Sequence, residues 1–159
     1  MVEVRPATGA DIPAFARLLG DMERGYGTVV PVETIEHDLR HAPAGVEFLL
    51  AVVPGDGVAG FASHSELWPS AGSGLGRLLF LKELYVAPKW RRRGIAKRLM
   101  GRIALLAQER GCPRVGWNAP RDNVAAQALY DGLGASRAEW LLSYRLAGEA
   151  LTKLAASGP

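Results

Sequence analysis

The sequence has few of the residues that build a disulfide framework, a metal cluster or a membrane span. Cys112 is its single cysteine among 159 residues, which excludes an internal disulfide and disfavours a cysteine-ligated metal. His37 and His41 lie four residues apart, but two ligands do not make a site, so we expect no metal. No apolar run is long enough to span a membrane, and the first fifteen residues lack the apolar core of a signal peptide. We therefore expect a cytoplasmic protein without a membrane partner.

An excess of one charge is also nearly absent. The formal net charge is +3, which by itself does not indicate binding to nucleic acid. The cations are nevertheless clustered in one segment: Lys89, Arg91, Arg92, Arg93, Lys97, Arg98 and Arg102. A solvated helix face is the ordinary interpretation, and a nucleic-acid-binding module is a rival. No pattern of stacking aromatics accompanies the cluster, so we expect no nucleic-acid partner.

Apolar periodicity predicts one α/β domain over residues 1–159, with a mixed sheet and helices on both of its faces. Thr8 and Asp11 form the signature of a capping box before the first helix, and glycines at 72, 74 and 76 mark a connection. The expected strands are 2–5, 46–53, 58–68, 78–86, 114–118 and 139–146, and the expected helices are 12–24, 31–40, 94–110, 123–132 and 148–156.

The most informative segment lies where the strand over 78–86 leads into a helix. A basic turn precedes Gly94, and the first N–H groups of a helix bind anions readily because they have no partner inside the helix. Gly94 lets a phosphate approach the backbone, and the small side chain of Ala96 keeps the next turn open. The spacing matches neither a Walker loop nor a dinucleotide fingerprint.

Two motifs together carry a family resemblance. Arg91-x-x-Gly94-x-Ala96 matches the acetyl-CoA signature R-x-x-G-x-[GA]. At a suitable distance downstream, Asn123-x-x-Ala126-x-x-x-Tyr130 with the following Gly-Ala is similar to a second segment of the same family. The chain therefore resembles the GNAT N-acetyltransferases. This resemblance implies the acyl-CoA N-acyltransferase fold, in which a mixed, predominantly antiparallel central sheet is flanked by helices.

The resemblance also implies how acetyl-CoA binds as a co-substrate. Backbone groups of 84–86 would hold pantetheine, N–H groups of 92–97 would hold the pyrophosphate, and Asn123 and Tyr130 would line the thiol end. The implied acetyl-CoA-binding residues are Leu84, Tyr85, Val86, Arg91, Arg92, Arg93, Gly94, Ile95, Ala96, Lys97, Asn123, Ala126 and Tyr130.

The same resemblance implies the catalytic groups. Tyr130 would protonate the departing thiolate, since an ordinary phenol with a pKa of about 10 is protonated at neutral pH. Glu83 is the candidate base or amine ligand, or else a carboxylate paired with a neighbouring cation. The branch that acetylates diamines, polyamines and thialysine usually has two acids where this chain has Lys82 and Glu83, so short amines with one charge are the expected acceptors. Strand alternation should point Lys82 away from Glu83.

The expected function is therefore transfer of acetyl from acetyl-CoA to a primary amine of a small molecule, by a homodimer. Acetylation of a protein amine and a non-catalytic acetyl-CoA sensor stay open as alternatives. An acyl-cysteine intermediate on Cys112 is disfavoured because no histidine partner is matched to it. His64 could face the substrate cleft, but a hydrogen-bonded histidine within the sheet is favoured, and Tyr26 and Trp68 fit either the acceptor pocket or the core.

Overall fold

The computed structural model describes residues 1–68 and 76–158, so two of the three connecting glycines, Gly72 and Gly74, lie outside the described residues. The elements in chain order are β1 (Glu3–Pro6), η1 (Gly9–Asp11), α1 (Ile12–Gly25), α2 (Val32–Arg40), β2 (Glu47–Val53), β3 (Gly57–Leu67), β4 (Leu78–Val86), η2 (Pro88–Trp90), α3 (Ile95–Glu109), β5 (Arg114–Trp117), α4 (Val124–Gly132) and α5 (Gly148–Ala156).

The chain forms two compact units, Met1–Asn123 and Val124–Pro159. The first unit contains the five strands and helices α1 to α3, and the second contains α4 and α5. Of the helices in the described ranges, none is both long and apolar enough to cross a membrane.

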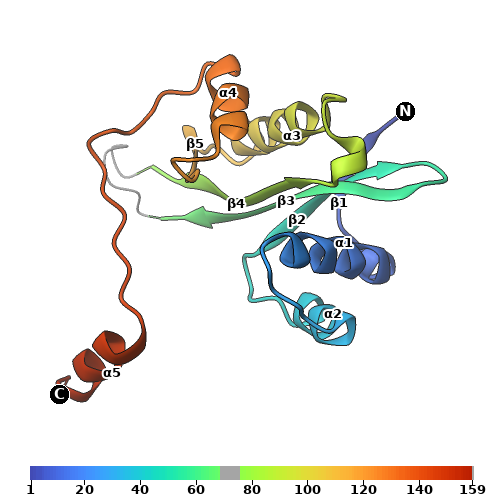
Figure 1. Cartoon of the computed structure of the whole chain (residues 1–159). Helices are drawn as coiled ribbons and strands as arrows, with labels where there is room; N and C mark the ends of the chain where they lie inside the picture. Colours follow the sequence, from blue (N-terminus) through green and yellow to red (C-terminus); the bar gives the residue numbers. More distant parts are fainter. Residues whose placement is uncertain (69–75, 159) are drawn as a thin grey trace. The chain divides into compact units, whose positions relative to one another are not determined.

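The sheet of the first unit has the order β1-β2-β3-β4-β5 (Figure 1). Neighbouring strands from β1 to β4 run antiparallel, and β4 and β5 run parallel. The parallel pair is joined through α3, because parallel neighbours need a crossover connection. This arrangement confirms the expected mixed, mostly antiparallel sheet.

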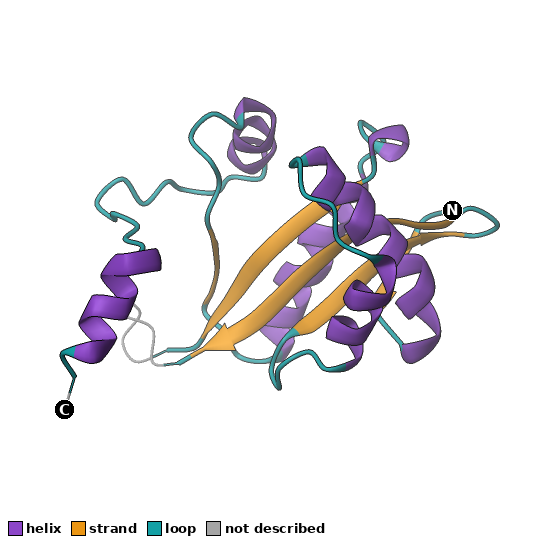
Figure 2. Cartoon of the chain, turned by 60° about the horizontal axis from the view of Figure 1, so that its bottom comes forward, coloured by secondary structure: helices purple, strands orange, loops and turns teal. Residues whose placement is uncertain are grey.

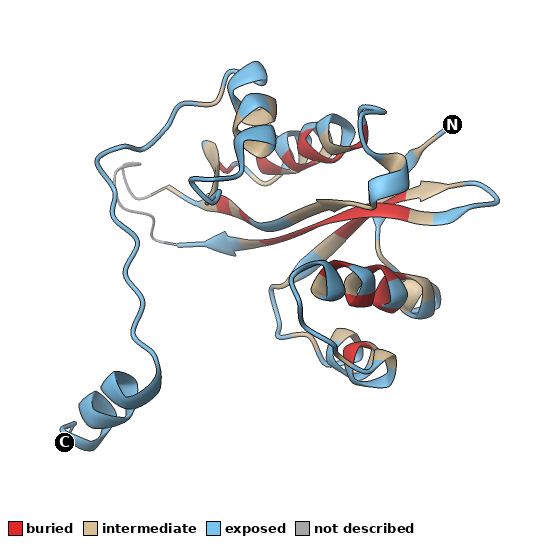
Figure 3. Cartoon of the chain, viewed as in Figure 1, coloured by how far each residue is buried: buried red, intermediate tan, exposed pale blue. Residues whose placement is uncertain are grey.

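Helices cover both faces of this sheet. Figures 1 and 2 show α1 and α2 on one face and α3 on the other. On the α1 face, Phe15, Leu18 and Met22 pack with Leu50 and Phe61 in one buried cluster, and Tyr85 packs against it. On the other face, α3 buries Ile95, Leu99 and Ile103 at the spacing that the sequence predicts. Figure 3 shows these buried residues in the sheet and in the helices α1 and α3 on its two faces.

Local signals account for the start of η1, the short 3-10 helix that leads directly into α1. The Asp11 carboxylate accepts hydrogen bonds from the backbone N–H of Thr8 at 2.8 Å and from its hydroxyl at 2.7 Å. Arg5 on β1 donates two more hydrogen bonds to the same carboxylate and holds its pKa well below the ordinary range. The capping box read from the sequence therefore also ties β1 to the helix that follows.

Two expectations for the C-terminal part are wrong. Residues 139–146 form no strand, although their apolar side chains alternate, because a strand needs a partner for its backbone groups and none of the recorded pairings includes them. Helical periodicity over 123–132 places Ala125, Ala128 and Leu129 on the buried side of α4, but the two alanines are exposed and Leu129 is half-buried. The short helix expected over 148–156 is present as α5.

Candidate active site

The candidate site begins where β4 and β5 separate. The two strands pair from Leu78 opposite Arg114 to Leu81 opposite Trp117; β5 ends there, while β4 continues to Val86. On its other side, β4 stays paired with β3 as far as Val86 itself. Within the described part of the chain, the outer edge of 84–86 has no strand beside it. Its backbone groups can therefore pair with an extended ligand.

A β-bulge in β4 lies just before this edge. Leu81 is opposite His64 and Glu83 is opposite Ser63, which makes Lys82 the extra residue. Directly opposite residues share a face of the sheet, and Ser63 and His64 are consecutive, so Leu81 and Glu83 lie on opposite faces. The strict alternation that was expected to turn Lys82 away from Glu83 is therefore interrupted here.

Glu83 lies on the face that α1 covers, since Tyr85, two residues further on, packs against the α1 cluster. The residue is exposed, yet neighbouring protein atoms keep part of the solvent from its carboxyl and so raise its pKa. The Glu23 carboxylate on α1 raises the pKa of Glu83 further by charge repulsion. A carboxylate with a raised pKa is a stronger base for work near neutral pH.

The turn between β4 and α3 has an unusual backbone. Arg92 has a φ of 61° and Gly94 a φ of 76°, so two residues close together adopt the left-handed conformation. A non-glycine residue in this region costs roughly 1–3 kcal/mol and is found mostly at functional sites. A Cβ on Gly94 would meet no protein atom within 4 Å, so the glycine is required by its backbone angle rather than by packing.

The start of α3 is open to an anion. Gly94 is the N-cap of the helix and supplies no side-chain hydrogen bond to the first turn. The N–H groups of Ile95, Ala96 and Lys97 therefore lack the side-chain acceptor that usually satisfies such groups. The positive end of the helix dipole adds to the attraction for a negative charge.

The cation cluster divides into two sets. Arg102 is paired with Glu109 on its own helix at 3.0 Å, which takes it out of the site. Within the described ranges, no ion pair involves the other members of the cluster, which are Lys89, Arg91, Arg92, Arg93, Lys97 and Arg98. Arg91 donates to the Val86 carbonyl at 3.0 Å, and Arg93 lies over the Trp90 ring at 4.8 Å. The first contact holds the turn against the end of β4, and the second lies within the turn.

The second motif lies at the boundary of the two units. Asn123 directly precedes α4, where the sequence predicts a helix cap, and Tyr130 is a half-buried residue of that helix. The Tyr130 carbonyl accepts the N–H groups of Leu133 and Ala135, and Gly134 takes a φ of 81° to end the helix. Ala126 and Tyr130 belong to the second unit, so their place in the site stays a prediction.

A family model described as "Acetyltransferase (GNAT) family" matches residues 13–135. The chain belongs to the GNAT acetyltransferase family. The match includes both motifs and runs across the boundary between the two units.

Relatives of this GNAT chain support the assignment. A thialysine N-epsilon-acetyltransferase of Caenorhabditis elegans is 33% identical over 84 residues, which is 51% of this chain and 52% of that protein. The chain spans about half the length of the curated relatives that head the comparison. The integron cassette protein VCH_CASS6 from the mobile metagenome of V. cholerae is 28% identical, with a TM-score of 0.89 and 98% of both chains covered.

A more distant structure agrees on the fold. The acetyltransferase AAC(6')-Iy, solved in complex with the bisubstrate analog CoA-S-monomethyl-acetylneamine, is 21% identical to the GNAT chain. It has a TM-score of 0.73 and covers 91% of this chain and 97% of its own. The acyl-CoA N-acyltransferase fold expected from the sequence is thereby confirmed.

The structure also places the residues outside the two motifs that could have taken part in catalysis or acceptor binding. Cys112 is buried, and burial raises the pKa of its thiol, which disfavours a thiolate nucleophile. His64 is fully buried, and its Nδ1 has no hydrogen-bond partner, so the ring is not fully satisfied as expected. Tyr26 and Trp68 are exposed, which rules out a core role for either. No group of three or more metal-ligating side chains was found among the described residues.

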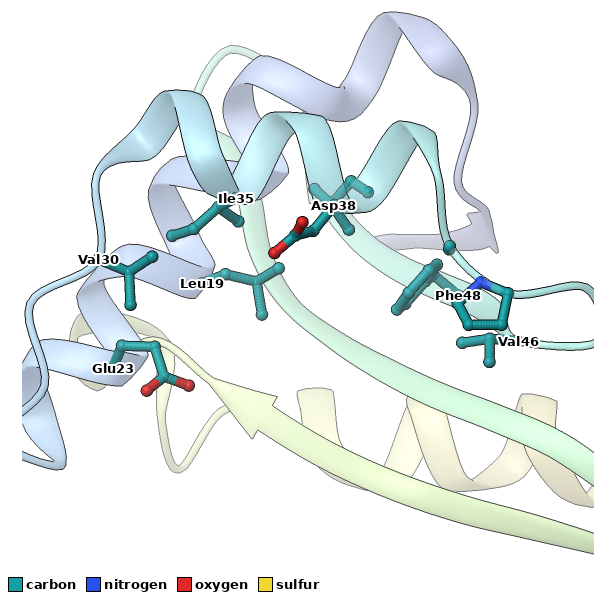
Figure 4. A pocket seen from close by; sticks show the side chains of 10 residues that line it. Leu19, Glu23, Val30, Ile35, Asp38, Val46 and Phe48 are labelled. Atoms are coloured by element: carbon teal, nitrogen blue, oxygen red, sulfur yellow. The ribbon is translucent and has the colours of Figure 1, made fainter.

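Sequence reasoning missed two acidic residues, Glu23 on α1 and Asp38 on α2. Both line a cavity of about 340 Å³ between α1, α2 and the start of β2 (Figure 4). Neither belongs to a motif, and only the packing of two helices brings them together. In the sequence, Glu23 and Asp38 follow the apolar residues Leu19 and Ile35 at helical spacing. This spacing alone does not tell whether such an acid lines a cavity or faces solvent.

Proposed function

We propose that this GNAT chain transfers an acetyl group from acetyl-CoA to a primary amine of a small molecule, by direct attack within a ternary complex. The observation that carries the proposal is the combination of an unpaired edge at 84–86 with a left-handed turn and an uncapped helix start at 92–97. An extended polar chain that ends in a pyrophosphate matches both features.

The residues present fit acetyl-CoA. Backbone groups of Leu84, Tyr85 and Val86 pair with the pantetheine arm, in the manner of an added strand. The N–H groups from 92 to 97 bind the pyrophosphate, and the unpaired arginines and lysines of the turn add charge. Asn123, Ala126 and Tyr130 border the thiol end. Bound there, acetyl-CoA supplies an acetyl group that is activated as a thioester.

The remaining chemistry concerns protons. An amine that is protonated in solution has no lone pair for attack, so Glu83 attracts the cation and accepts its proton, directly or through a water molecule. A backbone N–H near the end of β4 stabilises the negative charge that develops on the acetyl oxygen. As the C–S bond breaks, Tyr130 donates its phenolic proton to the departing sulfur. The second proton that the nitrogen loses on forming the amide then restores the phenol.

The names of the curated relatives favour a small-molecule acceptor, although a ribosomal-protein-alanine N-acetyltransferase from Brucella melitensis, 30% identical over 93% of this chain, is named for a protein amine. Relatives include enzymes named for thialysine and for aminoglycosides, which are small molecules with amino groups. A thiol-release assay with acetyl-CoA and a panel of small amines tests the proposal. Release with at least one small amine supports it, whereas release only with a peptide amine, or CoA binding without any turnover, would replace it by one of the two alternatives.

Tyr130→Phe tests the acid. The variant keeps the ring and removes the hydroxyl, so turnover should fall by about 10²–10⁴-fold, while CoA affinity and thermal stability stay close to those of the wild type. Single-turnover and steady-state assays report the loss of turnover, and calorimetry reports whether CoA affinity has changed. An unchanged turnover number would assign Tyr130 to packing.

We also propose that residues 1–159 act as one catalytic domain and that the protein works as a homodimer in the cytoplasm.

Support for the dimer comes from 139–146, where Trp140, Leu142 and Tyr144 are 75%, 75% and 87% exposed. Alternating apolar side chains suit a strand that is completed by a second copy, and large exposed apolar surfaces mark interaction sites. Light scattering should give a dimer for the wild type and a monomer for the Trp140→Ser/Leu142→Ser variant. A monomeric wild type would refute the dimer.

A further inference from the structure

The cavity between α1, α2 and the start of β2 combines an apolar wall with negative charge. Its wall is formed mainly by apolar side chains, among them Leu19, Ile35, Leu39 and Phe48. The polar exceptions are Glu23 and Asp38, and no lysine or arginine lines it. Figure 4 shows the Asp38 carboxylate among the apolar side chains and Glu23 at one end of the group.

Among the described residues, no cation forms an ion pair with either carboxylate. None of the ion pairs recorded for the described residues includes Glu23 or Asp38, although the same two helices pair Arg24 with Asp21 and Arg40 with Glu36. Asp38 is exposed and Glu23 is half-buried, so both carboxylates are accessible to a ligand. Their place beside apolar side chains suits a ligand that brings both a positive charge and a hydrocarbon surface.

Glu23 connects this cavity to the reacting end of the site. It lines the cavity, and its charge also acts on Glu83, the proposed base on β4. A cation held by Glu23 would therefore lie within the electrostatic reach of Glu83. The cavity is thus placed to hold the body of a molecule whose amine is presented at β4.

We infer that the cavity binds the acceptor, and that the acceptor is a primary amine with an apolar body, such as an aralkylamine, rather than an amino sugar. This inference rests on the proposed acetyl transfer and specifies its substrate class. A volume of about 340 Å³ fits a small molecule of this kind. An amino sugar would place its hydroxyl groups against aliphatic side chains without hydrogen-bond partners.

Filling the cavity tests the inference. Ala42 lines the cavity and Ala44, two residues further on, is exposed and does not, so Ala42→Phe and Ala44→Phe form a matched pair. With phenethylamine as the acceptor, KM should rise about tenfold or more in Ala42→Phe and stay within about twofold in Ala44→Phe. Asp38→Asn should raise KM as well, whereas Asp56→Asn in the β2–β3 turn should not.

Binding without turnover separates this inference from the proposed function. Phenethyltrimethylammonium has the same body and charge but cannot be acetylated, so calorimetry reports the cavity alone. If the ammonium compound binds to the wild type and not to Ala42→Phe, the inference is supported. This holds even if no amine releases thiol, in which case only the proposed function fails. If small polar amines are acetylated best and Ala42→Phe leaves their KM and the ammonium titration unchanged, the inference is overturned while the function stands.

Discussion

Cations and acids gather in separate places near the end of β4, although one cation, Arg91, lies over the Tyr85 ring of the α1 face at 5.9 Å. The turn before α3 presents cations that form no ion pair within the described residues, and a helix start without a side-chain cap. The α1 face instead carries Glu83 and Glu23, and Asp38 lies beyond them in the cavity. The difference suggests a division of labour, in which an anionic acetyl carrier binds from the side of the turn and a cationic acceptor binds from the side of α1.

The largest effect is expected from Gly94→Asp, which places a negative side chain at the proposed pyrophosphate site. CoA affinity should fall by about 100-fold or more, because both the backbone angle and the charge are disturbed. Gly111→Asp is the matched control, since Gly111 also has a positive φ, of 68°, and open space, but at the other end of α3. If calorimetry gave the same loss of CoA affinity in both folded variants, the turn would not be the site.

Glu83→Gln tests the opposite face. If Glu83 is the base, kcat should fall by about 10²–10⁴-fold, and the acidic limb of the pH–rate profile should disappear. CoA affinity should hardly change, because the Glu83 side chain lies outside the turn over 92–97 that is proposed to hold the pyrophosphate. Rates measured from pH 5 to 9 with several amines check this. A variant that retains its rate and profile for every acceptor would make Glu83 structural.

Glu23→Gln sharpens the link between cavity and base. The Glu23 charge raises the pKa of Glu83, so its removal lowers that pKa and moves the acidic limb of kcat/KM to lower pH. KM for phenethylamine should rise in the same variant. Glu33→Gln, an exposed change on α2 outside the cavity wall, serves as control. A limb that stays in place would show that the two carboxylates do not interact.

The smallest effect concerns stability on the α3 face. Burial lowers the pKa of His64, and nearby Arg110 lowers it too, while Glu47 and Glu66 act in the opposite direction. The unfolded chain therefore binds the proton more readily, so stability is lost as the pH falls below about 6.5, by at most about 1.4 kcal/mol per pH unit. Urea unfolding at pH 5 to 8 should show this slope in the wild type and not in His64→Leu. The same slope in both would exclude His64 as its source.

The sequence predicted the features that depend on nearby residues. The bounds of β4, the start of α3 at Gly94 and the cap at Thr8 and Asp11 all follow from short-range patterns. Features that depend on distant partners were missed. Residues 139–146 have the alternation of a strand but form none. The charge of Glu23 acts on Glu83 because α1 packs on the sheet.

Backbone amide NMR with successive addition of ligands tests the charge-divided sheet most directly. CoA added first should shift the amides of 92–97 and 84–86 and leave those of α1 and α2 largely unchanged. Phenethyltrimethylammonium added next should shift the amides around Glu23, Asp38 and Phe48, on the other face. If both ligands shifted the same set of amides, or if CoA shifted α1 and α2 instead of the turn before α3, the two-sided account would be contradicted.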